Sequence, residues 1–143
     1  MGSNQTIDDL NNMIELEYDA IAAYREAIDR IDTDAYKRKM SEFLDDHQRH
    51  VEELTSAVRN EGGQPEQEGD AKKVLTQGKV VMADMAGDKA ILKAMKTNED
   101  ETNKKYQKAV DSDYSSEVKS ILEKGLADER RHKAWIEETL DKL

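Results

Sequence analysis

The chain has 143 residues, the length of one domain of ordinary size. Acidic side chains outnumber basic ones by 32 to 22, and the net charge of −10 argues against nucleic-acid binding, which depends on neutralising phosphates. A mean hydropathy of −0.93, without a long apolar run, argues against a membrane segment, and a polar start without a leader predicts a cytoplasmic protein. The absence of cysteine excludes disulfides, thiolate nucleophiles and iron–sulfur clusters.

Four segments carry apolar residues at steps of three and four, the period of a helix with one buried face. The predicted helices span about residues 6–31, 34–61, 88–111 and 115–142. The second helix is expected to stop at Gly62-Gly63, because glycine accepts the left-handed conformation that ends a helix. Residues 62–87 are expected to form a crossover that contains a short helix. We therefore predict one all-α domain over residues 1–143, a four-helix bundle with one long crossover between helices two and three and no β-strand.

Six polar residues occupy positions on the helical stripes where core residues are expected. They are Glu17, His47, His50, Glu99, Glu129 and His132. Burying an unpaired carboxylate costs several kcal/mol, so the core must neutralise these acids or supply partners. A divalent metal does this economically, because carboxylate oxygen and imidazole nitrogen suit iron, manganese and zinc. A metal-free polar core is the alternative.

The spacing of these residues shows an internal repeat. A single offset of 82 residues relates Glu17 to Glu99, His47 to Glu129 and His50 to His132. Each half therefore contributes one acid from its first helix and a pair at positions i and i+3 from its second. Residues three apart on a helix point the same way, so both pairs can face one cavity.

Further polar residues accompany the repeat. Asp46 and Asp128 are equivalent positions, and metal-bound histidines usually donate their other N–H group to a carboxylate. We predict that each aspartate holds the histidine of the opposite helix, with two exposed acids as the alternative. The hydroxyl groups of Tyr24 and Tyr106 are expected either to serve a ligand site, by hydrogen bonding or electron transfer, or to be satisfied locally in a packed core. Arg130-Arg131 is interpreted as a solvated helix face.

One glutamate from each of two helices, with a Glu-x-x-His pair from each of the other two, is the ligand pattern of ferritin-like di-iron carboxylate proteins. The sequence resembles this superfamily from Thr6 to Leu143 and looks most similar to small bacterial four-helix-bundle proteins near the rubrerythrin branch. The matching positions are Glu17, His50, Glu99, Glu129 and His132. The sequence departs from the pattern at His47, where the family has a bridging glutamate.

The resemblance implies a ferritin-like metal protein that binds two iron ions per chain, with manganese or zinc as alternatives, and reacts with dioxygen or peroxide in ferroxidase- or peroxidase-like chemistry. It implies terminal ligands at Glu17 and Glu99, a bridge at Glu129, and one nitrogen ligand each from His50 and His132. An imidazole does not bridge two metals as a carboxylate does. With His47 at this position, a site for a single metal ion therefore remains an alternative to the two-metal site. The alternative function is a non-catalytic binding or stress-response bundle with a mononuclear, zinc-like or degenerate site.

The expected partners are metal ions and dioxygen or peroxide, without nucleic acid or membrane. Because the chain has no cysteine, a rubredoxin-like module is excluded. One chain carries the complete ligand set, so no partner subunit is needed to form the site. The chain leaves no room for a fifth helix after Leu143, and we therefore expect a monomer or small homo-oligomer, not a cage.

Overall fold

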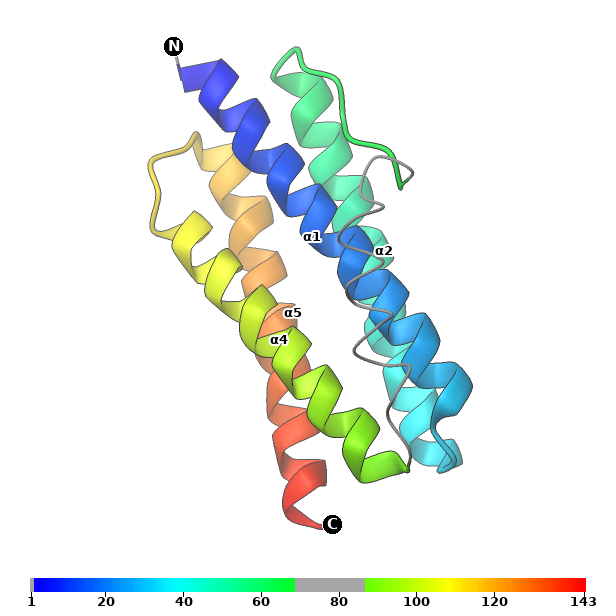
Figure 1. Ribbon diagram of the computed structural model, residues 1–143. Coiled ribbons are helices and arrows are strands. Elements are labelled where there is room, and N and C mark those ends of the chain that lie inside the picture. The colour runs from blue at the N-terminus through cyan, green and yellow to red at the C-terminus, as the bar shows by residue number, and fades with distance from the viewer. Residues whose placement is uncertain (1, 69–86) are drawn as a thin grey trace.

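A computed structural model describes residues 2–68 and 87–143, and within these ranges the chain forms four α-helices and no strand (Figure 1). The helices are α1 (Gly2–Arg30), α2 (Asp34–Asn60), α4 (Asp88–Val110) and α5 (Ser116–Asp141). The predicted all-α fold is confirmed, although α1 begins before the expected start at Thr6. The short helix expected within the crossover lies outside the described residues. None of the helices described here is long and apolar enough to cross a bilayer.

The helices form two antiparallel hairpins that pack side by side. α1 pairs with α2, and α4 pairs with α5, while α1–α4 and α2–α5 contacts join the hairpins. Figure 1 shows α2 and α4 running in the same direction, which is the topology of a bundle with one long crossover. Among the four neighbouring pairs, α2 and α5 make the sparsest contact.

Local backbone chemistry sets the ends of the helices. At the end of α2, Gly62 has a positive φ of 86°, a conformation that suits glycine. The N–H of Gly62 donates to the carbonyl of Arg59 at 3.0 Å, and the N–H of Gly63 donates to that of Val58 at 2.9 Å. This pair of bonds is the Schellman arrangement, so the predicted stop at Gly62-Gly63 is confirmed.

Apolar side chains fill the two ends of the bundle and leave a polar layer between them. One cluster contains Leu10, Met13, Ile14, Leu54, Ala57, Val58, Tyr106, Ala109, Val118, Leu122 and Leu126. The other contains Ala23, Tyr24, Ala27, Ile31, Met40, Phe43, Ile91, Leu92, Met95 and Ile136. Because each cluster draws on all four helices, the layer between them is closed off at both ends of the bundle.

A carboxylate at the start of α4 ties the two hairpins together. Asp88 accepts hydrogen bonds from the backbone N–H of Asp32 at 2.7 Å and of Thr33 at 3.2 Å, and from the Thr33 hydroxyl at 2.5 Å. Slight burial opposes ionisation, but these hydrogen bonds outweigh it and lower the pKa of Asp88 below its ordinary value of 3.8. The ionised Asp88 side chain, which belongs to the α4–α5 hairpin, therefore binds the backbone N–H groups of the turn between α1 and α2.

We expect Asp88→Ala to lower the free energy of unfolding at pH 7 by about 1 kcal/mol, the usual cost of losing a side-chain cap. Since the folded-state pKa of Asp88 is lowered, its contribution is present above pH 3.8 and is lost as the pH falls through the folded-state value. Urea unfolding at pH 7 and pH 3 measures both effects, with Lys89→Ala as the neighbouring control. An equal loss at the two pH values would contradict this account.

Candidate metal centre

The six polar residues of the helical stripes lie together in the layer between the apolar clusters. α1 supplies Glu17, α2 supplies His47 and His50, α4 supplies Glu99, and α5 supplies Glu129 and His132. The relative exposure of these side chains is 0% for five of them and 2% for His50. The structure therefore brings together every residue that the sequence nominated as a metal ligand.

The donor atoms of these side chains form two overlapping groups. One group is Glu17, His47, His50 and Glu129, and the other is His47, Glu99, Glu129 and His132. In each group the donor atoms lie within 4.8 Å of one another. His47 and Glu129, which the 82-residue repeat relates, belong to both groups. The site is thus built as two similar halves that share two residues.

The ring of His47 lies between the two halves. Its Nδ1 atom is 2.5 Å from Oε1 of Glu17, and its Nε2 atom is 3.3 Å from Oε1 of Glu129. Burial opposes protonation of the ring, but the charges of Glu129 and Glu17 outweigh it and raise the pKa of His47 well above 6.5. Without metal, His47 is therefore a buried cation between carboxylates.

The three glutamates have unequal surroundings. Burial opposes ionisation of Glu17, but the charge and hydrogen bonds of His47 and His50 outweigh it and lower the pKa of Glu17 to about 2. For Glu129, burial together with the charges of Glu99 and Glu17 outweighs the attraction of His47 and raises its pKa to about 8. Glu129 is the carboxyl group that the surrounding residues neutralise least.

Two tyrosines hold the single glutamates from across the bundle. The hydroxyl of Tyr24 donates to Glu99, and that of Tyr106 donates to Oε2 of Glu17 at 2.5 Å. Burial and the neighbouring carboxylates raise both tyrosine pKa values well above 10, so both hydroxyls remain donors. At Gly125 a Cβ atom would collide with the Tyr106 ring, and glycine therefore permits this approach. The sequence-based expectation of hydrogen-bonding hydroxyls is confirmed, and electron transfer stays a prediction.

The two remaining histidines bind aspartates of the opposite helix. Nε2 of His50 is 2.8 Å from Oδ2 of Asp128, and Nε2 of His132 is 2.8 Å from Oδ2 of Asp46. The predicted pairing across helices is confirmed. Burial opposes protonation of His132, but Asp46 and the nearby glutamates raise its pKa to about 10. The Nδ1 atoms of both rings face the carboxylates of the cluster. That of His50 lies 3.1 Å from Glu17, and that of His132 lies 3.2 Å from Glu129.

Sequence reasoning missed three contributors to the site. The Thr102 hydroxyl donates to the Glu99 carboxylate at 3.2 Å. The amide of Asn103 donates to the backbone carbonyls of Glu99 at 2.7 Å and Glu129 at 3.0 Å, and thereby joins α4 to α5. Phe43 stacks on a histidine ring of the site, with ring centroids 4.2 Å apart. The positions of Thr102 and Asn103, three and four residues after Glu99, could have indicated that they contact it. There was no such indication for Phe43 beyond its place on the apolar stripe.

Arg131 lies on an exposed helix face, as predicted, with its side chain 50% exposed, but it also makes ion pairs that the sequence analysis did not predict. Its guanidinium group is 2.7 Å from Asp46 and 3.0 Å from Asp128, the two aspartates that hold the histidines. The exposed side chain of Arg131 therefore also links the two aspartates. A usable signal was present, because an aspartate is followed by an arginine three residues later at Asp46–Arg49 and again, 82 residues on, at Asp128–Arg131.

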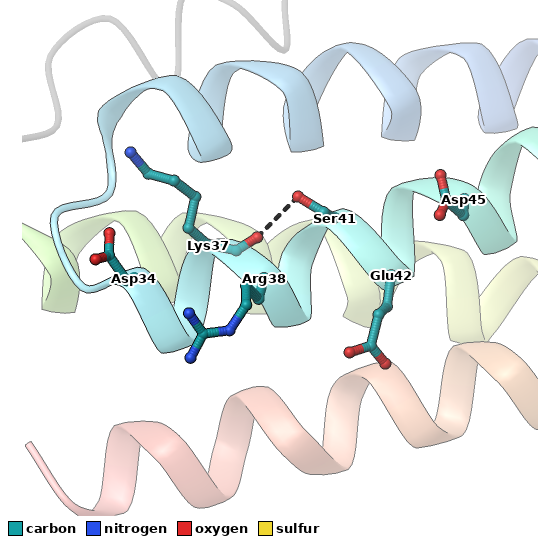
Figure 2. Close-up of a pocket in the computed structure, with 6 residues that line it drawn as sticks. All are labelled: Asp34, Lys37, Arg38, Ser41, Glu42 and Asp45. Atoms are coloured by element: carbon teal, nitrogen blue, oxygen red, sulfur yellow. Dashed lines mark hydrogen bonds between the residues drawn. The ribbon is translucent and has the colours of Figure 1, made fainter.

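A separate surface hollow lies along the first turns of α2 (Figure 2). Its lining residues, Asp34, Lys37, Arg38, Ser41, Glu42 and Asp45, all come from this one helix. Figure 2 shows one hydrogen bond among them, from the Ser41 hydroxyl to the Lys37 carbonyl at 2.9 Å. Charges of both signs lie along the helix here without converging on one point, so the buried cluster is the stronger candidate site.

The residues of the cluster fit a divalent metal. Carboxylate oxygen and imidazole nitrogen are donors that iron, manganese and zinc accept. Within the part of the chain that the structure describes, Oε2 of Glu129 is among the few buried side-chain atoms without a hydrogen-bond partner. A buried carboxylate oxygen without a partner is costly, and a cation shared by the two halves would satisfy it.

Comparison with known proteins places the chain in a family without an assigned function. A family described as "Domain of unknown function (DUF2383)" matches residues 5–112. The chain belongs to this family. A search of curated proteins found no match. A solved structure of a dodecameric thioferritin, the bacterioferritin-related protein from Bacteroides fragilis, has a TM-score of 0.84 at 16% identity over 98% of this chain and 86% of that one. This likeness shows a ferritin-like four-helix bundle.

The same comparison conflicts with one sequence-based expectation. The Bacteroides protein is a dodecamer, whereas we expected that the present chain would not form a cage. That expectation rested on the lack of room for a fifth helix. It is withdrawn, because assembly of a bundle depends on contacts between the sides of its helices, which chain length does not decide.

Proposed function

We propose that the protein binds divalent metal in the buried cluster of three glutamates and three histidines, with two iron ions per chain as the expected load. The observation that carries this proposal is the buried Oε2 atom of Glu129, which lacks a hydrogen-bond partner among the described residues and belongs to both donor groups. The likeness to a thioferritin supports iron as the metal, with manganese as an alternative. The closer placement near the rubrerythrin branch stays a prediction.

The proposed ligands divide by halves. Glu17 and His50 would hold one ion, Glu99 and His132 the other, and Glu129 would serve both. Ferrous ions bound here would supply electrons to dioxygen or peroxide, which is ferroxidase- or peroxidase-like chemistry. The tyrosine hydroxyls orient the carboxylates of α1 and α4, and the apolar clusters at both ends of the bundle exclude water from the site. This arrangement holds the ligands in place before a metal enters.

A second candidate is a non-catalytic protein with a single metal ion. It is favoured by the short contact between Nδ1 of His47 and Glu17, which places an imidazole where the family pattern has a bridging carboxylate. Each donor group holds two histidines and two glutamates, a set of nitrogen and oxygen donors that one zinc ion accepts. The metal content of the protein separates this candidate from the di-iron proposal.

Metal content tests the proposal directly. Protein purified without chelators and loaded anaerobically with ferrous iron is expected to hold about two ions per chain, measured by plasma mass spectrometry. Glu129→Ala should abolish binding, because both donor groups contain this residue. Glu123→Ala, an exposed glutamate of the same helix, is the matched control. Unchanged occupancy in Glu129→Ala would refute the proposed site, and one ion in the wild-type chain would favour the second candidate.

His47→Glu tests the departure from the family pattern. The imidazolium of His47 neutralises buried carboxylates, so a fourth glutamate should destabilise the metal-free protein by several kcal/mol. Ligand binding stabilises the folded state, and the variant, with a second bridging carboxylate, should gain more stability from manganese than the wild type does. Calorimetric melting temperatures with and without manganese measure both effects, and His47→Gln is the uncharged control. A variant that melts lower but gains no more from manganese than His47→Gln would contradict this role.

A further inference from the structure

Two arginines and two aspartates form a closed ring of alternating charge between α2 and α5. Arg49 contacts Asp46 on its own helix at 3.2 Å and also binds Asp128 of the opposite helix. Arg131 contacts Asp128 on its own helix at 3.0 Å and Asp46 of the opposite helix at 2.7 Å. The ring therefore bridges the neighbouring pair of helices that is in sparsest contact.

The two halves of the ring use their carboxylate oxygens in the same way. On Asp128, Oδ2 accepts from His50 and from Arg49, while Oδ1 accepts from Arg131. Asp46 follows the same pattern. Its Oδ2 atom accepts from His132 and Arg131 of α5, and its Oδ1 atom accepts from Arg49 of its own helix. Each carboxylate is thus held by three donors, which fixes its plane and the direction in which it meets the imidazole.

We propose that Arg49 and Arg131 are positioning residues, which act through Asp128 and Asp46 to hold the Nε2–H groups and so aim the Nδ1 atoms of the site histidines into the cluster. The reason for positioning the rings rests on the proposed metal function, whereas the contacts that position them are present without a metal. The aspartates are partly exposed, at 19% and 14%, so without the arginines they are free to turn towards water. The histidines would then lose the partner that sets their orientation.

Charge alone does not account for the ring. A single exposed ion pair contributes little stability, and a lysine at either position would supply the same charge. The guanidinium group is a planar fork with several N–H donors, which lets one side chain reach two carboxylates at once. Arg49 and Arg131 each do so, and the double contact distinguishes them from Arg130, which donates to Gln107 instead.

The two histidines should depend on the ring to different degrees. His132 also stacks on Phe43 at 4.2 Å, so that packing holds its ring from one face. The repeat places Gly125 at the position equivalent to Phe43, and the rings nearest to His50, those of His47 at 5.6 Å and Tyr106 at 5.8 Å, are not stacked on it. We therefore expect loss of the arginines to disturb His50 more than His132.

The first readout needs no metal. In the ¹⁵N-labelled metal-free wild type, the Nε2–H protons of both histidines are expected to exchange slowly with water. The double variant Arg49→Gln/Arg131→Gln should exchange them several-fold faster, with the larger effect at His50. Arg130→Gln should leave the rates unchanged, and Arg49→Lys/Arg131→Lys should restore them only in part. The single variants Arg49→Gln and Arg131→Gln replace the double variant should it fail to fold.

The second readout is metal affinity, measured by competition of zinc with a chelator. We expect the double glutamine variant to bind zinc roughly 10–100-fold more weakly than the wild type and the Arg130→Gln control. Unchanged exchange rates in the folded arginine variants would overturn the positioning role. A wild-type chain that binds no metal would overturn the proposed function instead, and the exchange rates would still decide whether the arginines position the rings.

Discussion

The cost of burying three carboxylates at the centre of a helical bundle governs the rest of the structure. Glu17, Glu99 and Glu129 have no exposure to solvent, and each comes from a different helix. Charges in such a place are strongly destabilising unless they are paired and hydrogen-bonded. Three histidines and two tyrosines, together with a threonine on the same helix as Glu99, supply these partners, and apolar clusters cover the layer from both ends.

The partners of each glutamate come mainly from other helices, and this links the fold to the site. Glu17 of α1 is bound by His47 of α2 and Tyr106 of α4, and Glu99 of α4 is bound by Tyr24 of α1. A helix cannot shift without breaking a buried charged contact on its neighbour. The polar layer therefore fixes the register of the helices, which apolar packing alone specifies less sharply, and it does so at the place where ligand geometry matters.

The sequence predicted the bundle, the repeat and the set of residues in the polar layer, because helical periodicity and an offset of 82 residues are properties of the chain itself. It also predicted that Asp46 and Asp128 would bind the histidines of opposite helices, since the repeat places them symmetrically. It did not reveal that Tyr24 and Tyr106 cross to the glutamate of the other half, or that Arg131 binds two aspartates. Those contacts depend on how far apart the helices lie and on the reach of long side chains, which periodicity does not specify.

The most direct test of a metal centre in this layer is anomalous diffraction at the iron absorption edge, from crystals of the protein grown with ferrous iron. The account predicts strong peaks inside the bundle, one beside Glu17 and His50 and one beside Glu99 and His132, with Glu129 next to both. An iron-loaded crystal with no peak in the polar layer, or with peaks only at surface carboxylates, would contradict it. The buried cluster would then be a metal-free network of ion pairs.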